Sequence, residues 1–136
     1  MKNQLRSILE EEVTAINALV NILEVQHSLL VNQDVFQLEK ITKDIDECSR
    51  NLARSEGKRR GLIGQNSMKV ILETLGEEEI DEVYLKVTSS LNELIIQKES
   101  NELLIKQSLS YTNSMLAMIG PKKETPTYNA YGKVGR

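Results

Sequence analysis

Apolar residues recur at alternating steps of four and three along one long stretch of this chain, from Glu77 to Ile119. The stretch contains no proline or glycine. This alternation is the repeat of a coiled coil, and at 1.5 Å per residue it predicts one helix of roughly 64 Å. A helix of that length exceeds any small globular core, so the rest of the chain is expected to pack along it. The predicted seam consists of Ile80, Tyr84, Val87, Leu91, Leu94, Lys98, Asn101, Ile105, Ser108, Thr112, Met115 and Ile119.

The seam becomes polar between Lys98 and Thr112, where apolar residues move to its flanks. Leu104, Tyr111 and Met118 lie on one side, and Leu109 and Leu116 lie on the other. The resulting apolar arc is wider than a two-helix seam needs. This pattern indicates a helix held by two neighbours, or a helix with apolar surface left for a third.

Two further helices are expected before it, over residues 4–31 and 35–63. The first has a broad apolar face, which favours contact with two neighbours, and His27 beside that face is expected to be a hydrogen-bonded flank residue. The second has a narrow stripe that alternates three and four among charges of both signs, the mark of a solvated outer face. Its stripe consists of Leu38, Ile41, Ile45, Cys48, Leu52, Ser55, Arg59 and Leu62.

Short polar segments separate these helices. Asp34, followed by Gln37, predicts an N-cap with a capping-box partner. Gly61 and Gly64 are expected to end the second helix, and Ser67 to cap a short amphipathic helix over residues 68–75 that plugs the end of the bundle. The long helix is then expected over residues 77–119, because Gly120 and Pro121 stop it.

These elements predict an all-α fold: an elongated, antiparallel three-helix coiled-coil bundle with a long third helix. Residues 1–120 form the helical domain, and residues 121–136, which are polar and without period, form a disordered, flexible C-terminal tail. The third helix is longer than the second, so residues beyond about Leu104 or Gln107 are expected to lack a neighbour on it.

That unmatched segment carries more apolar surface than water normally faces, so it is the candidate binding surface for a partner helix. Its methionines suit a surface that adapts to a partner. Two alternatives are homodimerisation through the same surface and a kinked helix that packs back on the bundle. The candidate residues are Leu104, Leu109, Tyr111, Met115, Leu116, Met118 and Ile119.

Composition narrows the function classes. A net charge of -3 and a pI near 5.3 argue against a nucleic-acid partner. There is one histidine, one cysteine, no glycine-rich phosphate loop and no pairing of a nucleophile with a base, so neither an enzyme nor a metal or other cofactor is expected. The N-terminus has no apolar signal core, and the longest apolar run has five residues, Met115 to Ile119. A cytoplasmic protein without stable membrane insertion is therefore expected.

Several local sequences, taken in order, resemble the FlgN family of flagellar type III export chaperones. They are the amphipathic helix from Leu5 to Val31, the run Val35 to Ile41, the pair Arg59 and Arg60, the run Asn101 to Ile105 with Leu109 and Tyr111, and the tail segment Tyr128 to Gly132. The resemblance covers nearly the whole chain.

The resemblance implies a cytosolic chaperone that binds the two hook-filament junction (hook-associated) proteins through its third helix and delivers them to the export gate. It also implies that a tyrosine near the C-terminus docks on the cytoplasmic domain of the gate, and Tyr128 and Tyr131 are both candidates. Two alternatives are a chaperone for another cargo such as flagellin, and a self-associating coiled-coil scaffold. The preferred junction protein, the affinity and the oligomeric state do not follow from the sequence.

Overall fold

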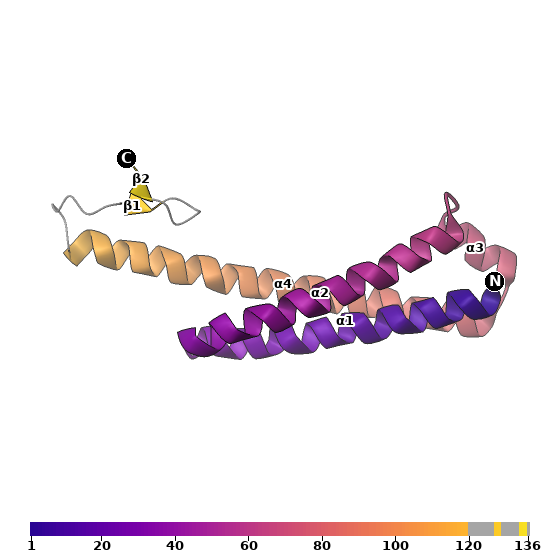
Figure 1. The fold of residues 1–136 in the computed structure, drawn as a ribbon, viewed down its shortest axis with the longest axis horizontal. Helices are drawn as coiled ribbons and strands as arrows, with labels where there is room; N and C mark the ends of the chain where they lie inside the picture. Colours follow the sequence, from indigo (N-terminus) through magenta and orange to yellow (C-terminus); the bar gives the residue numbers. More distant parts are fainter. Residues whose placement is uncertain (120–126, 129–133, 136) are drawn as a thin grey trace. The chain divides into compact units, whose positions relative to one another are not determined.

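A computed structural model describes residues 1–119, 127–128 and 134–135. These residues form four helices: α1 (Lys2–Val31), α2 (Val35–Ile63), α3 (Met68–Leu75) and α4 (Glu78–Ile119), as Figure 1 shows. Two short strands, β1 (Thr127–Tyr128) and β2 (Val134–Gly135), pair antiparallel. The expected all-α class is confirmed. The chain divides into two compact units, Met1–Leu104 and Ile105–Arg136.

The helix boundaries follow the predicted ones closely. The first helix begins at Lys2 instead of residue 4, and the long helix begins at Glu78 instead of residue 77. The prediction that Gly61 helps to end α2 is wrong, because Gly61 lies within the helix and Gly64 follows its last residue. Gly64 has a φ of +64°, a conformation that a residue without Cβ adopts at little cost.

The expected caps are present, with one difference. The carboxylate of Asp34 accepts a hydrogen bond from the backbone N–H of Gln37 at 3.2 Å, as predicted. The capping box is wrong, since the backbone N–H of Asp34 donates to the carbonyl of Leu29. Ser67 caps α3 by accepting from the N–H of Val70 at 3.2 Å.

In the first unit, α1 and α2 are antiparallel neighbours (Figure 1). Lys58 of α2 pairs with Glu11 at 3.1 Å, and Arg59 Nε donates to Glu12 Oε1 at 2.7 Å. Every position of the stripe predicted for α2 is buried or half-buried, so that stripe is confirmed. Glu12 is only 3% exposed, so the pair that it forms with Arg59 is a buried ion pair between the two helices.

The apolar core of the first unit joins all four helices. α3 contributes Met68 and Ile71 to this core, which also includes Leu5 and Leu9 from the start of α1. The short helix predicted for residues 68–75 is therefore part of the core. The remaining buried members of the core are Ile16, Leu19, Val20, Leu23, Ile63, Ile80, Val87 and Leu94.

Helix α4 runs parallel to α1, as the contacts at the two ends of α1 show. Near the start of α1, Lys2 pairs with Glu77 at 2.6 Å and Arg6 with Glu79 at 2.7 Å. Far along both helices, the side chain of Asn101 donates to the carbonyl of Leu23 at 2.8 Å.

Up to Asn101, the buried face of α4 differs from the predicted seam at two positions. Leu91 and Lys98 are exposed, while the preceding residues, Ser90 and Gln97, are buried and half-buried. Gln97 and Ser90 lie four and eleven residues before Asn101, so they share its helical face. The helix is thus rotated so that the side chain of Asn101 faces α1 while Leu91 is exposed. Beyond Asn101 the prediction of a buried seam is wrong, because all its positions are exposed: Ile105, Ser108, Thr112, Met115 and Ile119.

Asn101, 2% exposed, is the centre of a hydrogen-bond network. Its Nδ2 donates to the carbonyl of Leu23 and to Gln26 Oε1, both at 2.8 Å. Its Oδ1 accepts from Gln97 Nε2 at 3.0 Å and lies 3.1 Å from His27 Nδ1. Because Oδ1 can only accept, the proton of this contact belongs to His27 Nδ1. All four hydrogen-bonding capacities of the amide are used, and the prediction of a hydrogen-bonded His27 is confirmed.

By length and composition alone, α1 could cross a membrane. The core helix of a globular unit passes the same test, and Leu19, Val20 and Leu23 from this part of α1 are buried in the core. The same helix holds the buried carboxylate of Glu12, paired with Arg59.

The second unit contains the helical segment from Ile105 to Ile119 and the β1–β2 pair, in which Tyr128 lies opposite Val134. Most of the tail predicted to be disordered, residues 121–136, lies outside the described residues, so that prediction is not tested.

The satisfied amide of Asn101 gives a first prediction, for the isosteric change Asn101→Asp. A carboxylate cannot donate to the carbonyl of Leu23 or to Gln26, and it places a charge in a buried site, so we expect unfolding to become easier by about 3 kcal/mol. Urea denaturation followed by circular dichroism measures this loss. The same change at exposed Asn113 is the matched control and should shift the free energy of unfolding very little. Equal stability of the two variants would contradict a structural role for the network.

A second prediction concerns pH. Burial raises the pKa of Glu12 above its usual 4.5; the charge of Arg59 and its hydrogen bond lower it in part, and Glu56 adds a further raising effect. A raised pKa in the folded state means that the stabilisation is present below pH 4.5 and is lost as the pH rises through the folded value. The variant Glu12→Gln lacks this titration.

We therefore expect the stability of the unaltered protein, relative to Glu12→Gln, to fall as the pH rises above 4.5. Denaturation at several pH values measures this difference. Glu11→Gln, which alters the exposed pair with Lys58, is the control and should show a flatter pH dependence. A relative stability that rises over this range would contradict the sign of the shift.

Candidate protein-binding surface

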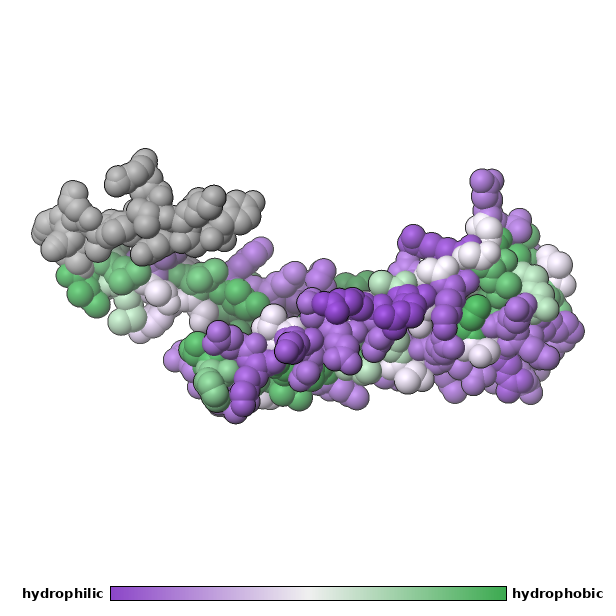
Figure 2. Space-filling model, in the orientation of Figure 1, coloured by the Kyte–Doolittle hydropathy of each residue, from purple (hydrophilic) through white to green (hydrophobic). Residues whose placement is uncertain are grey.

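The helical segment of the second unit presents its apolar side chains to solvent. Leu109 is 59% exposed, Leu116 is 63% exposed and Met118 is 81% exposed. Figure 2 shows hydrophobic residues, in green, along this part of α4. None of the residues from Ile105 to Ile119 is buried. An intact helix with this many exposed large apolar groups is typical of an interaction surface.

The apolar side chains occupy about half of the helix circumference at 100° per residue. Ile105, Leu109 and Leu116 form one face, and Tyr111, Met115 and Met118 form the adjoining one. The opposite face holds small and amide side chains. No charged residue occurs from Gln107 to Ile119, so the surface can be covered without desolvating a charge.

The predicted residues are found in two settings. Leu109, Tyr111, Met115, Leu116, Met118 and Ile119 are all exposed on the helix of the second unit. Leu104 belongs to the first unit and is half-buried. Their role in cargo binding stays a prediction.

Exposed apolar residues also occur at two positions that were not predicted from the sequence. Leu103 and Ile105 are exposed, and neither was among the candidates. Ile105 was assigned to the buried seam, and Leu103 lies outside the helical repeat. Leu103 lies about 200° around the helix from Asn101, so it points away from the buried face. Ile105 follows Asn101 by four residues and lies on nearly the same face, so its place on the helix does not by itself predict its exposure.

Of the two tail tyrosines, one lies among the described residues. Tyr128 lies in β1, and Tyr131 lies outside the described residues. Their predicted role at the export gate is untested.

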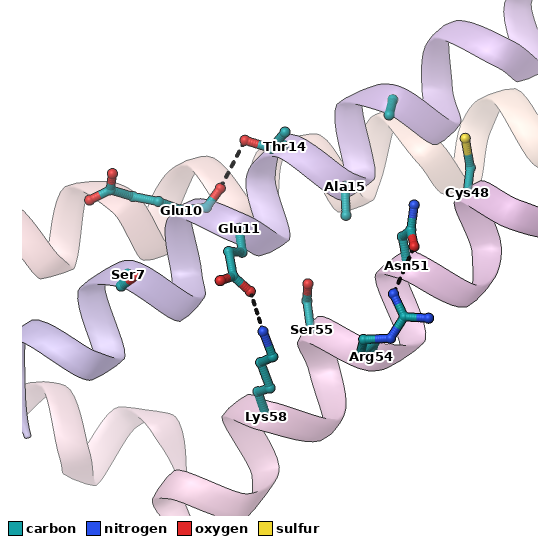
Figure 3. Close-up of a pocket in the computed structure, with 11 residues that line it drawn as sticks. Ser7, Glu10, Glu11, Thr14, Ala15, Cys48, Asn51, Arg54, Ser55 and Lys58 are labelled. Atoms are coloured by element: carbon teal, nitrogen blue, oxygen red, sulfur yellow. Dashed lines mark hydrogen bonds and ion pairs between the residues drawn. The ribbon is translucent and has the colours of Figure 1, made fainter.

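The first unit also has an open cleft of about 580 Å³ between α1 and α2, shown in Figure 3. Its polar groups bind one another: Lys58 pairs with Glu11 across the cleft, and Arg54 Nη1 donates to Asn51 Oδ1 at 2.9 Å. Ala15 and the half-buried thiol of Cys48 also line it. The charged groups of the cleft are thus mostly satisfied within the protein.

The described residues contain no group of three or more histidine, cysteine, aspartate or glutamate side chains placed to hold a metal ion. His27, the one histidine of the chain, is held by Asn101. The feature that stands out among the described residues is the uncharged apolar helix face from Gln107 to Ile119. Such a face is typical of a surface that binds another protein.

Neither the curated proteins nor the solved structures contain a match to this chain. A family model does match: the FlgN model, described as FlgN protein, covers residues 1–136, the whole chain. The resemblance carried by the sequence motifs is therefore confirmed, and the chaperone character of the family fits the expectation of a protein that is not an enzyme. The chain belongs to the FlgN family, and this membership indicates a chaperone of flagellum biogenesis.

Proposed function

We propose that this protein is a cytoplasmic export chaperone that binds hook-filament junction proteins through α4 and delivers them to the flagellar type III export gate. The observation that carries the proposal is the uncharged apolar helix from Gln107 to Ile119, exposed on a chain of the FlgN family. In this proposal the surface lies on the long helix of the antiparallel three-helix bundle that the sequence predicts.

The recognition mode that suits this surface is helix packing. An amphipathic segment of the cargo would bury Leu109, Leu116 and Met118, each worth about 1.5 to 3 kcal/mol before ordering costs. The methionines tolerate different partner shapes, which suits a chaperone for two related cargoes. The proposed cargo residues are Leu104, Leu109, Tyr111, Met115, Leu116, Met118 and Ile119.

Delivery requires a second contact that leaves the cargo surface free. Tyrosine is favoured as an interface residue, and the tail carries Tyr128 and Tyr131. A tail that binds the gate while α4 holds the cargo would join the two in one complex and raise their effective concentration.

The cargo surface is tested with the double variant Leu109→Asp and Leu116→Asp. Both side chains are mostly exposed, so we expect unchanged helicity and a loss of junction-protein binding of at least about 100-fold, because two charges would have to be desolvated. Isothermal titration calorimetry with purified junction proteins measures the affinity.

The double variant Ser110→Asp and Asn113→Asp places the same charges on the polar face of the same segment, and it should bind normally. Loss of helicity together with binding in the leucine variant would show that these residues are core. Equal binding by both double variants would remove the segment as the cargo surface, and retention of flagellin alone would change the cargo.

The tail is tested with Tyr128→Ala and Tyr131→Ala, singly and together. We expect the melting temperature and junction-protein affinity to stay unchanged while binding to the soluble domain of the export gate weakens. The single variants identify which tyrosine matters. Gate binding that is the same for the double variant and the unaltered protein would exclude the tyrosines from docking.

A further inference from the structure

Within the first unit, the face of α4 opposite to the one that packs on α1 exposes three large apolar side chains. Leu85 is 69% exposed, Ile96 is 67% exposed and Leu103 is 57% exposed. At 100° per residue the three lie within about 20° of one another and about 200° around the helix from the buried Asn101. They therefore point away from the core of the unit. We call this side of α4, within about 80° of Leu85 and up to Leu104, the outer face.

The exposed positions of the outer face follow the spacing at which one helix packs along another. The steps between them alternate four and three, the repeat of a coiled-coil seam. Every one of these positions is exposed: Glu78, Glu82, Leu85, Ser89, Asn92, Ile96, Glu99 and Leu103.

This face also has a hollow of the kind that receives a side chain from a facing helix. An open hollow of about 350 Å³ is lined by Glu82, Leu85, Lys86 and Ser89. These residues stand at positions i, i+3, i+4 and i+7 of α4. In a coiled coil, each side chain of one helix enters a hole formed by four residues of the facing helix. The small Ser89 leaves room for such a side chain.

The charge of the outer face has one sign. Five carboxylates and no basic side chain lie on it, while Lys86 lies at its margin, about 100° from Leu85. The described part of the chain supplies none of the five with an ion-pair partner. The carboxylates are those of Glu78, Asp81, Glu82, Glu93 and Glu99.

Stabilisation of the helix start accounts for only part of this charge. Glu78 and Asp81 lie in the first turn, where the helix dipole favours a carboxylate. Glu93 and Glu99 are several turns away, beyond the reach of that effect. A molecule that covers Leu85, Ile96 and Leu103 must therefore bring positive charge beside its apolar groups.

We propose that the outer face of α4 binds a basic amphipathic helix of another protein. The apolar side chains of that helix cover Leu85, Ile96 and Leu103, and one of them enters the hollow beside Ser89. Its lysine and arginine side chains pair with the carboxylates that flank the apolar positions. Charges arranged in this way set the partner and the direction of packing.

The charge separates this occupant from the others. A second copy of the chain would bring the same carboxylates to the interface, and an anionic lipid surface or a nucleic acid would be repelled by them. The proposed cargo segment from Gln107 to Ile119 has no charged residue, so its partner needs none. The inference concerns a different surface and does not depend on the proposed function.

The first experiment uses a synthetic helical peptide as the probe. The peptide has about 21 residues, with leucine at four-three spacing and lysine at the flanking positions. A matched peptide carries glutamate in place of each lysine. We expect the full-length protein to bind the lysine peptide at least about tenfold more tightly, by fluorescence anisotropy, and to lose this preference at high salt. Equal binding of the two peptides would overturn the proposal.

The carboxylates are tested with the double variant Glu82→Lys and Glu99→Lys. We expect the dissociation constant of the lysine peptide to rise at least about tenfold. The double variant Glu39→Lys and Glu47→Lys changes two exposed carboxylates of α2 and alters the net charge equally, so it is the matched control. An equal rise for both would mean that the net charge alone attracts the peptide, and it would overturn the site.

The apolar part is tested with Ile96→Ser, and the hollow with Ser89→Leu, which fills it. Both residues are exposed, so we expect normal helicity and binding of the lysine peptide weakened by about tenfold. Val70→Ser, at an exposed apolar residue of α3, is the control and should bind normally. Normal binding by Ile96→Ser would overturn the proposal.

The other occupants are tested with the same Ile96→Ser variant. A mass of twice 15.4 kDa that halves in this variant would show a self-interface, and anionic vesicles bound only by the unaltered protein would show a membrane surface; either result would overturn the proposal. We expect junction-protein affinity to stay unchanged, and its loss would make the outer face a cargo surface instead. Since the Leu109 and Leu116 variant tests the cargo segment alone, a failure of either idea is seen separately.

Discussion

The orientation of α4 depends on the side-chain amide of Asn101. The amide is buried against α1, and its two hydrogens and two lone pairs are all used, by Leu23, Gln26, Gln97 and His27. Turning α4 about its axis would break these contacts and leave buried polar groups unpaired, at a cost of about 1 to 3 kcal/mol for each. An apolar seam tolerates such a turn more easily, because one leucine can replace another. The amide therefore fixes which residues of α4 face α1.

That fixed orientation explains why α4 exposes apolar groups within the first unit. Positions four, seven and eleven residues before Asn101 are Gln97, Leu94 and Ser90, and all three face the bundle. Leu91 and Ile95, which would satisfy a purely apolar seam, are turned outward instead. The helix thus gives up apolar burial in the first unit. This is a familiar use of a polar residue in a seam, where specificity is gained at some cost in stability.

The sequence predicts α2 better than α4 for the same reason. In α2 many of the residues between the stripe positions are charged, in both signs, so the apolar repeat can face the core in one way only, and all eight positions were correct. In α4 both Ser90 and Leu91, and both Gln97 and Lys98, could occupy the seam, and hydropathy favours the wrong member of the first pair. The partners of Asn101 lie up to 78 residues away in the chain, so no local pattern reveals that its amide is satisfied. The exposure of Ile105 was missed because the four-three repeat continues past Asn101, whereas every residue from Ile105 to Ile119 is exposed.

The exposed segment from Gln107 to Ile119 is costly for the protein to leave uncovered. It carries no charged residue, and its large apolar groups face solvent. Such a surface is an aggregation hazard in the free protein. The same lack of charge means that a cargo helix could cover the segment without desolvating a charge on it. The property that makes the segment a hazard when free is therefore the one that suits it to the proposed cargo binding.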